Sequence, residues 1–181
     1  MAFHLCVKGL YITMSIVFQV DLGLFILNMN STTYALQVNS RKRLVYVYWG
    51  SRLPRAEDLP LGEQLQFYPF EEEEKKFRVN EEYAGWGGYF FDEPCLKVKF
   101  ADGVRDLSLL YHSHEITEDH SSQTLRILQR DEIYPLQVTL VYQLYPDSDI
   151  VDRCCVLENL GVDPIYLENV QSGVCRTGHT K

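Results

Sequence analysis

The chain has 181 residues, with 17 lysines and arginines against 25 aspartates and glutamates, which gives a formal net charge of −8. This length fits one domain with a substantial core, and 46% hydrophobic and 23% charged residues are typical of a globular protein. The acidic excess argues against a nucleic-acid partner, because phosphate binding requires a basic face.

The apolar N-terminal stretch predicts neither a secretion signal nor a membrane span. Residues 9–18 are apolar, but a single Lys8 comes before them and no small-x-small cleavage site follows. Asp21 interrupts the run before it reaches the roughly 20 residues that cross a bilayer. We expect no membrane association, and we interpret residues 1–13 as translated upstream sequence, with natural translation starting at Met14.

Alternation of apolar and polar residues predicts β-strands with one buried face. The clearest pattern covers residues 136–144, where the even positions are apolar. Residues 95–100 alternate as clearly and end at an Asp-Gly turn, which predicts a hairpin whose return strand starts at Asp106. In chain order, strands are expected at 16–20, 23–29, 33–38, 43–49, 95–100, 124–130, 136–144, 150–158 and 164–170.

Two further features complete the fold prediction. Residues 159–164 have the composition of a turn and predict a hairpin between the last two strands. No run of a dozen residues has helical periodicity. The predicted fold is therefore all-β, an antiparallel β-sandwich.

Residues 51–82 interrupt the strand pattern. They contain Pro54, Pro60 and Pro69, and a long irregular stretch within a compact domain is usually functional or disordered. The chain then reaches Trp86, which glycines flank on both sides, so that the backbone can take unusual angles and expose the ring. This pattern fits a carbohydrate platform, but we favour a tightly packed β-corner.

The cysteines indicate neither a zinc site nor a disulfide framework. Their number is odd, and no C-x-x-C pair occurs. Adjacent Cys154 and Cys155 would point to opposite faces of a strand, so a disulfide between them would strain the backbone. We expect reduced thiols in a cytoplasmic protein. The cysteines are Cys6, Cys95, Cys154, Cys155 and Cys175.

The histidines and acidic turns do not form a metal-binding pattern. His112 and His114 are expected on one face of a strand, with Glu115 and His120 nearby, but no further ligand stands at a metal-site spacing. Residues 147–152 lack the glycine and the distal glutamate of a calcium loop. We expect no metal and no cofactor.

No motif of a catalytic centre is recognisable. Nothing marks a pair of carboxylates fixed on opposite sides of a sugar, as a glycosidase needs. No glycine-rich phosphate loop follows a strand, and no G-x-S-x-G elbow occurs. We therefore predict no catalytic residue in this chain.

Several short motifs, taken together and in order, resemble those of a known family. The motifs are Val47-Tyr-Trp-Gly50, Glu82-Tyr-Ala-Gly-Trp-Gly-Gly88, Glu93-Pro-Cys-Leu-Lys-Val98, Phe100-Ala-Asp-Gly-Val-Arg-Asp-Leu107, Ser113-His-Glu-Ile116 and Tyr145-Pro-Asp-Ser-Asp149. Through them the chain between about Met14 and Ser172 is similar to the N-terminal β-sandwich (supersandwich) domain of family 36 glycoside hydrolases, the bacterial-type α-galactosidases. Family members continue into further strands, so we expect a sandwich incomplete at its C-terminus and an unstructured tail at 173–181.

The resemblance implies a three-part enzyme of β-sandwich, (β/α)₈ barrel and small C-terminal β-domain. In the family the barrel supplies an Asp nucleophile in a Lys-x-Asp motif and an Asp acid/base, which give retaining hydrolysis of terminal α-galactosides such as melibiose and raffinose. This chain contains no Lys-x-Asp motif. The resemblance therefore implies an inactive fragment that serves as scaffold and oligomerisation domain, in a homo-oligomer that is a tetramer in relatives.

The resemblance also implies candidate sugar-binding residues. In tetrameric family members, the loop after Tyr-Trp-Gly reaches a neighbouring subunit's active site and contributes an Asp and an Arg. Asp58 matches the Asp, and Lys75 stands near the Arg position without the planar fork of a guanidinium. Trp86 is a third candidate, which rests on its glycine-flanked ring and not on the resemblance. A solvated loop without sugar contact is an equally open interpretation.

Two functions from different classes stay open. The first is a non-catalytic part of an α-galactosidase. The second is a free-standing carbohydrate-binding or interaction module that uses Trp86. We favour the first, because an autonomous module should end on a complete sheet.

Overall fold

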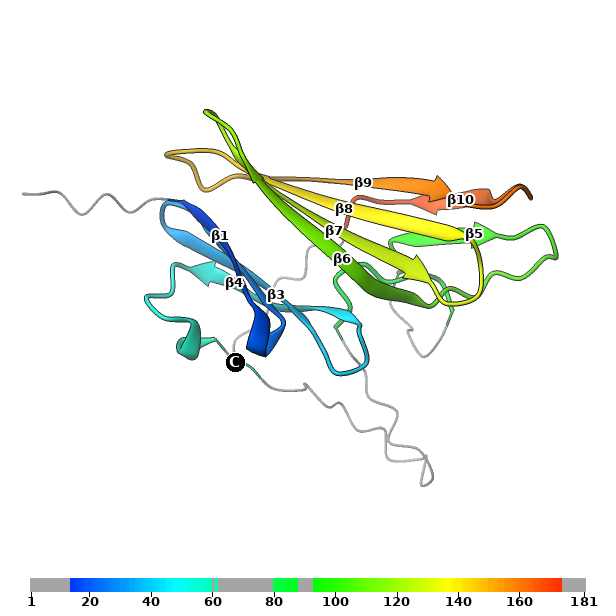
Figure 1. The fold of residues 1–181 in the computed structure, drawn as a ribbon, viewed down its shortest axis with the longest axis horizontal. Coiled ribbons are helices and arrows are strands. Elements are labelled where there is room, and N and C mark those ends of the chain that lie inside the picture. The colour runs from blue at the N-terminus through cyan, green and yellow to red at the C-terminus, as the bar shows by residue number, and fades with distance from the viewer. Residues whose placement is uncertain (1–13, 60, 62–79, 88–92, 174–181) are drawn as a thin grey trace, which may run out of the picture.

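The computed structural model describes residues 14–59, 61, 80–87 and 93–173, and this part of the chain is built almost entirely from β-strands (Figure 1). The expected extension 1–13, Lys75, Cys6, Cys175 and all but the first residue of the expected tail lie outside the described residues. The elements are β1 (Ser15–Gln19), the 3₁₀ turn η1 (Val20–Leu22), β2 (Leu24–Asn28), β3 (Thr32–Val38), β4 (Leu44–Ser51), the 3₁₀ turn η2 (Ala56–Asp58), β5 (Leu96–Lys99), β6 (Leu109–Glu118), β7 (Gln123–Asp131), β8 (Leu136–Leu144), β9 (Val151–Asn159) and β10 (Tyr166–Val170).

The strands form three antiparallel sheets. One has the order β1-β2-β3-β4, a second has the order β6-β7-β8-β9, and β5 pairs with β10 in a two-stranded ribbon. The two four-stranded sheets face each other, and β5 and β10 lie beside the right-hand end of the β6–β9 sheet in Figure 1. The predicted all-β antiparallel sandwich is confirmed.

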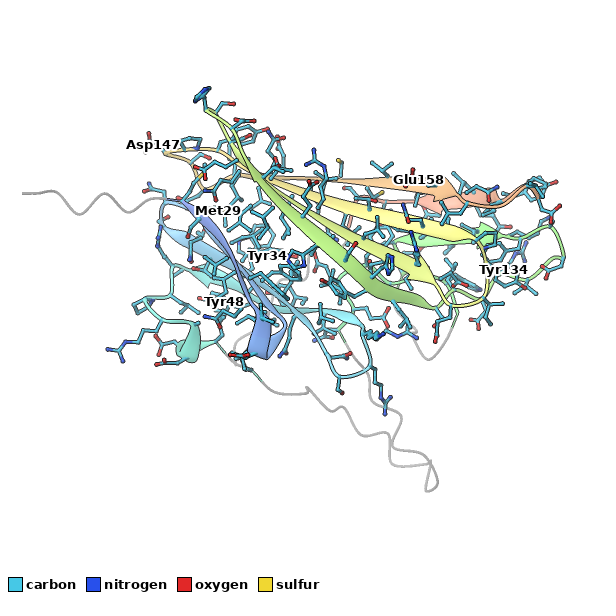
Figure 2. All side chains as sticks on the ribbon, viewed as in Figure 1. Met29, Tyr34, Tyr48, Tyr134, Asp147 and Glu158 are labelled. Atoms are coloured by element: carbon cyan, nitrogen blue, oxygen red, sulfur yellow. The ribbon has the colours of Figure 1, made fainter. Side chains whose placement is uncertain are left out.

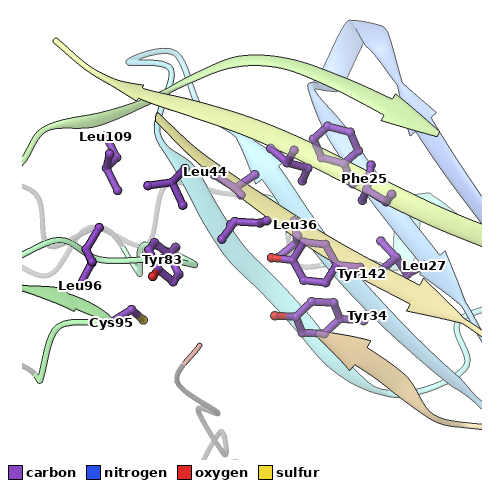
Figure 3. Packing of buried hydrophobic residues seen from close by; sticks show 14 of the residues in the cluster. Phe25, Leu27, Tyr34, Leu36, Leu44, Tyr83, Cys95, Leu96, Leu109 and Tyr142 are labelled. Carbon is purple, nitrogen blue, oxygen red and sulfur yellow. The ribbon is translucent and has the colours of Figure 1, made fainter. Parts of the chain in front are cut away.

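The core fills the space between the sheets, as the alternation in β8 requires. The even-numbered residues of β8 are all apolar or aromatic, and each is at most 2% exposed. They pack with Phe25 and Leu27 of β2 and Leu36 of β3 (Figure 3). Figure 2 shows the side chains that occupy this space, with Tyr34 among them.

A second, smaller core covers the outer face of the first sheet. Residues 24–27 of β2 are buried on both faces, because the segment after β4 folds back over the sheet. Leu59 from this segment is 5% exposed and packs with Leu24, Ile26 and Val47. This contact fixes the turn that carries Asp58.

Two predicted hairpins were wrong. β5 pairs with β10 and not with a return strand from Asp106, although the turn itself forms, with Gly103 N–H donating to the Phe100 carbonyl at 2.9 Å. The second wrong prediction is the hairpin between β9 and β10. The chain turns away from β9 after residue 159, and among the described strands β9 pairs only with β8. Alternation reveals which face of a strand is buried but not which strand lies beside it.

Glu82 links both sheets through a buried ion pair. Its carboxylate Oε1 accepts hydrogen bonds from Tyr34 Oη at 2.6 Å and from Tyr142 Oη at 2.8 Å. Arg153 Nη1 lies 2.8 Å from the same oxygen, and Arg153 Nη2 donates to the Glu82 carbonyl at 3.0 Å. Glu82 is 4% exposed. One carboxylate thus holds β3, β8 and β9 together, and Figure 3 shows the two tyrosine rings side by side in the core.

We predict that Arg153→Met lowers the free energy of unfolding by about 3–5 kcal/mol, because it leaves the Glu82 carboxylate buried without its cation. The matched control is Arg126→Met. Arg126 lies in the same sheet but is exposed and 4.0 Å from Glu115, so its loss should cost less than about 1 kcal/mol. Urea unfolding measures both, and equal costs would contradict the role of the buried pair.

The same network predicts a loss of stability at alkaline pH. Burial, and then the Glu82 carboxylate, raise the pKa of Tyr34 well above its ordinary value of 10.0. The unfolded chain then releases this proton near pH 10 while the folded chain keeps it, so stability is intact below pH 10 and falls above it. Tyr34→Phe should reduce the loss of stability between pH 10 and 11 by about 1 kcal/mol, because the unfolded tyrosine goes from half to mostly ionised over this range. Unfolding at a series of pH values tests this, and identical slopes would count against it.

Candidate functional site

Asp58 lies on an exposed turn with a buried anchor. The Asp58 amide donates to the Arg55 carbonyl at 3.2 Å, and the Leu59 amide donates to the Ala56 carbonyl at 3.1 Å, which closes η2. Because Leu59 is buried beneath the turn, Glu57 and Asp58 both remain exposed to solvent. The turn can therefore offer carboxylates to the hydroxyl groups of a ligand.

Trp86 lies at a packed corner beside β5. Its amide donates to the Leu96 carbonyl at 2.8 Å, and its carbonyl accepts from the Leu107 amide at 2.9 Å. The side chain is nevertheless 47% exposed, and Lys97 Nζ lies 5.0 Å from the centroid of its ring. The structure thus combines the backbone of a β-corner with an accessible aromatic ring.

The glycines around Trp86 are required by close packing. A Cβ at Gly85 would lie 2.6 Å from the Leu107 Cβ. Gly87 has a φ of +107°, and a Cβ there would lie 1.7 Å from Asp106 Oδ1. These contacts hold the corner closely against the segment that precedes β6.

The structure does not bring Asp58 and Trp86 together. Asp58 lies on the turn that follows β4, and Trp86 is hydrogen-bonded beside β5. This turn and β5 lie at opposite ends of the long axis in Figure 1. Within one copy of this chain the two side chains therefore belong to separate surfaces. Lys75 lies outside the described residues.

The expectation that His112 and His114 share a face was wrong. Tyr111 pairs with Gln129 and Ser113 with Leu128, so His112 is the extra residue of a β-bulge. The bulge reverses the alternation. His112 is exposed, whereas His114 turns inward, 4.2 Å from Phe18 between ring centroids.

His114 belongs to an aromatic cluster. Its Nδ1 lies 2.7 Å from Tyr111 Oη, and its ring meets that of Phe25 edge-on at 4.9 Å. Burial lowers the pKa of His114. Among residues 14–59, 61, 80–87 and 93–173, no group of three or more His, Cys, Asp and Glu side chains could hold a metal ion.

Asp149 has a structural role. Its Oδ1 accepts hydrogen bonds from the Ser31 amide at 2.7 Å and from the Thr32 amide at 3.0 Å. The Ser31 hydroxyl also donates to Oδ2 at 2.6 Å, and this bond first, then the amide bonds, lower the pKa of Asp149. The acid that resembled a calcium ligand instead joins the loop before β9 to the turn between β2 and β3.

The adjacent cysteines point to opposite faces of β9, as predicted. Cys154 is exposed, while Cys155 is half-buried and 3.5 Å from the Tyr83 hydroxyl. No disulfide forms among Cys95, Cys154 and Cys155, the cysteines of the described segments. No helix in the described part of the chain is long and apolar enough to span a membrane.

Sequence reasoning missed one concave surface. A groove of about 600 Å³ lies at the end of the first sheet, where residues of β1, η1, β3 and β6 meet. Nothing in the sequence marks it, because its residues are spread over nearly a hundred positions. Its lining includes Phe18, Asp21, Leu22, Val38, Leu61 and Tyr111.

The fold and the motif series place this chain among the β-domains of glycoside hydrolases. The model of the glycosyl hydrolase family 36 N-terminal domain matches residues 42–177. The chain belongs to this family, and the resemblance deduced from the motifs is confirmed.

Two relatives illustrate the match in sequence. The chain is 24% identical over 176 residues to the bifunctional alpha-galactosidase/sucrose kinase AgaSK of Mediterraneibacter gnavus, covering 86% of this chain and 19% of that protein. It is 30% identical over 106 residues to the alpha-galactosidase Mel36A of Lactobacillus acidophilus, covering 50% of this chain and 14% of that protein.

The fold is shared with solved structures. The GH36 alpha-galactosidase AgaB from Geobacillus stearothermophilus matches with a TM-score of 0.74 and 22% identity, over 87% of this chain and 24% of that one. The galactosidase domain of AgaSK matches with the same TM-score. The chain thus spans at most about a quarter of the length of these relatives.

We predict that Gly87→Ala disturbs the corner more than Gly103→Ala. Both glycines have positive φ, but nothing lies within 4 Å of a Cβ at Gly103. Gly103→Ala should cost about 1 kcal/mol from backbone strain. Gly87→Ala should cost a further ~1–3 kcal/mol, on the scale of other overpacking changes, because Asp106 must move.

The readout is acrylamide quenching and urea unfolding followed by tryptophan fluorescence. The chain has two tryptophans, so Trp49→Phe in the background leaves Trp86 as the reporter. Equal costs for the two variants, with unchanged quenching, would show that the corner does not depend on this contact.

Proposed function

We propose that this chain is the non-catalytic N-terminal domain of an α-galactosidase that hydrolyses terminal α-galactosides such as melibiose and raffinose. The observation that carries the proposal is the family match over residues 42–177. The relatives described above are α-galactosidases, and structures of AgaA from Geobacillus stearothermophilus hold raffinose and stachyose.

Within such an enzyme we assign the chain a scaffolding and homo-oligomerisation role, with a contribution to the sugar site through Asp58, Lys75 and Trp86. The exposed carboxylate of Asp58 on a turn anchored by Leu59 supports this role, because a fixed acceptor can pair with a sugar hydroxyl. The thiols of the described cysteines, which form no disulfide, support a reducing compartment such as the cytoplasm.

A chimera tests the proposal. This chain replaces the N-terminal domain of AgaA, and hydrolysis of raffinose is measured for the chimera and for the isolated chain. We expect activity in the chimera and none above background in the isolated chain. In the chimera, Asp58→Ala should raise KM by about ten-fold with little change in kcat, as expected for a lost hydrogen bond to a charged group that binds substrate and transition state alike.

Glu57→Ala is the matched control, because Glu57 is the neighbouring exposed carboxylate on the same turn. It should leave KM unchanged. Turnover by the rigorously purified isolated chain would refute the non-catalytic assignment. A chimera that assembles and hydrolyses raffinose but responds equally to both variants would remove Asp58 from the sugar site.

A further inference from the structure

Aromatic and cationic side chains share the outer face of the β5–β10 ribbon. Leu96 and Val98 of β5 are fully buried, so Lys97 and Lys99 point to the opposite face. The register places Tyr166 of β10 beside Lys99. On the other edge of β5, a bridge between Gly85 and Leu96 holds the segment that carries Trp86. We call the surface formed by Trp86, Lys97, Lys99 and Tyr166 the β5 outer face.

The two rings of the β5 outer face are accessible and lie on either side of the lysines. Trp86 is 47% exposed and Tyr166 is 53% exposed. Lys97 Nζ lies 5.0 Å from the Trp86 ring centroid, and Lys99 Nζ lies 5.2 Å from that of Tyr166. The two lysines are about 7 Å apart along the strand. A surface with two accessible rings on either side of the lysines suits an extended ligand built from rings with apolar faces.

Three cations lie at or beside this face, and two of them are paired with carboxylates. Lys97 pairs with Glu93 at 2.9 Å, and Arg105 pairs with Glu168 at 2.7 Å. Among the described residues no carboxylate pairs with Lys99, whose ammonium group instead contacts the Tyr166 ring. Lys99 is therefore the cation of this face that can pair with an anionic ligand, and salt screens it from acidic residues more than about 8 Å away.

We propose that the β5 outer face binds an acidic oligosaccharide, whose pyranose rings stack on Trp86 and Tyr166 and whose carboxylate pairs with Lys99. Pyranose rings supply apolar C–H faces for stacking, and a uronic acid supplies the anion that complements Lys99. A single-stranded nucleic acid shares part of this chemistry, but its phosphate at every residue conflicts with the net charge of −8. The site does not depend on the proposed enzyme.

The test uses the 181-residue chain and an oligomer of galacturonic acid, titrated by calorimetry at low and high salt. A neutral galactan oligomer and an oligonucleotide of thymidine are the comparison ligands. We expect binding of the galacturonate oligomer that weakens as salt rises. Trp86→Ala and Tyr166→Ala should each weaken it about ten-fold through the lost stacking. Lys99→Gln should weaken it and reduce its salt dependence.

Trp49→Ala is the matched control, because Trp49 is 48% exposed but lies on β4 in the other sheet. It should leave binding unchanged. Absence of galacturonate binding, equal affinity for neutral galactan, preference for the oligonucleotide, or an equal loss in Trp49→Ala would each overturn the proposal. If Trp86→Ala disturbs the packed corner, Tyr166→Ala and Lys99→Gln still test the proposal. Tyr166 is exposed and Lys99 is half-buried, so neither change should disturb the fold.

Discussion

The carboxylate of Glu82 is the constraint on which the rest of the structure depends. A charge buried in the core needs donors around it, and here they come from β3, β8 and β9. Because a buried carboxylate without its partners costs several kcal/mol, arrangements of the sheets that separate these donors are disfavoured. The Glu82 amide also donates to the Leu44 carbonyl of β4 at 3.0 Å, so the segment 80–87 is tied to both sheets.

The exposed surfaces follow from this anchor. After Glu82 enters the core, Tyr83 is fully buried, and the chain must turn sharply to leave again. Gly85 and Gly87 allow that turn because no side chain would fit against Leu107 and Asp106. Trp86 between them is directed outward, beside β5. A buried ion pair thus determines where an exposed ring stands, just as buried Leu59 determines where Asp58 stands.

The sequence predicted the strands better than their partners, for a physical reason. Alternation in β8 and β9 reflects burial of one face, so the observed bounds lie within about two residues of the expected ones. The pairing of β5 with β10 depends on contacts nearly 70 positions apart, which a local pattern does not encode. The bulge at His112 was equally invisible, as was the link from Glu82 to Arg153 across 71 positions. At the candidate site, the exposure of Trp86 and its packed corner were predictable from the glycines, whereas its lysine neighbour was not.

The departure of β10 from β9 creates the β5 outer face. If β10 had returned along β9, Tyr166 would not stand beside Lys99, and the β5 outer face would hold one ring instead of two. The buried side of the same ribbon, with Leu96 and Val98, belongs to the core that gives the family its fold. A domain with 22–30% identity to the relatives described above can keep that buried side while its outer side changes freely. The shared fold therefore explains the buried inner face of β5, whereas the ligand of the β5 outer face is determined by the side chains that this chain exposes there.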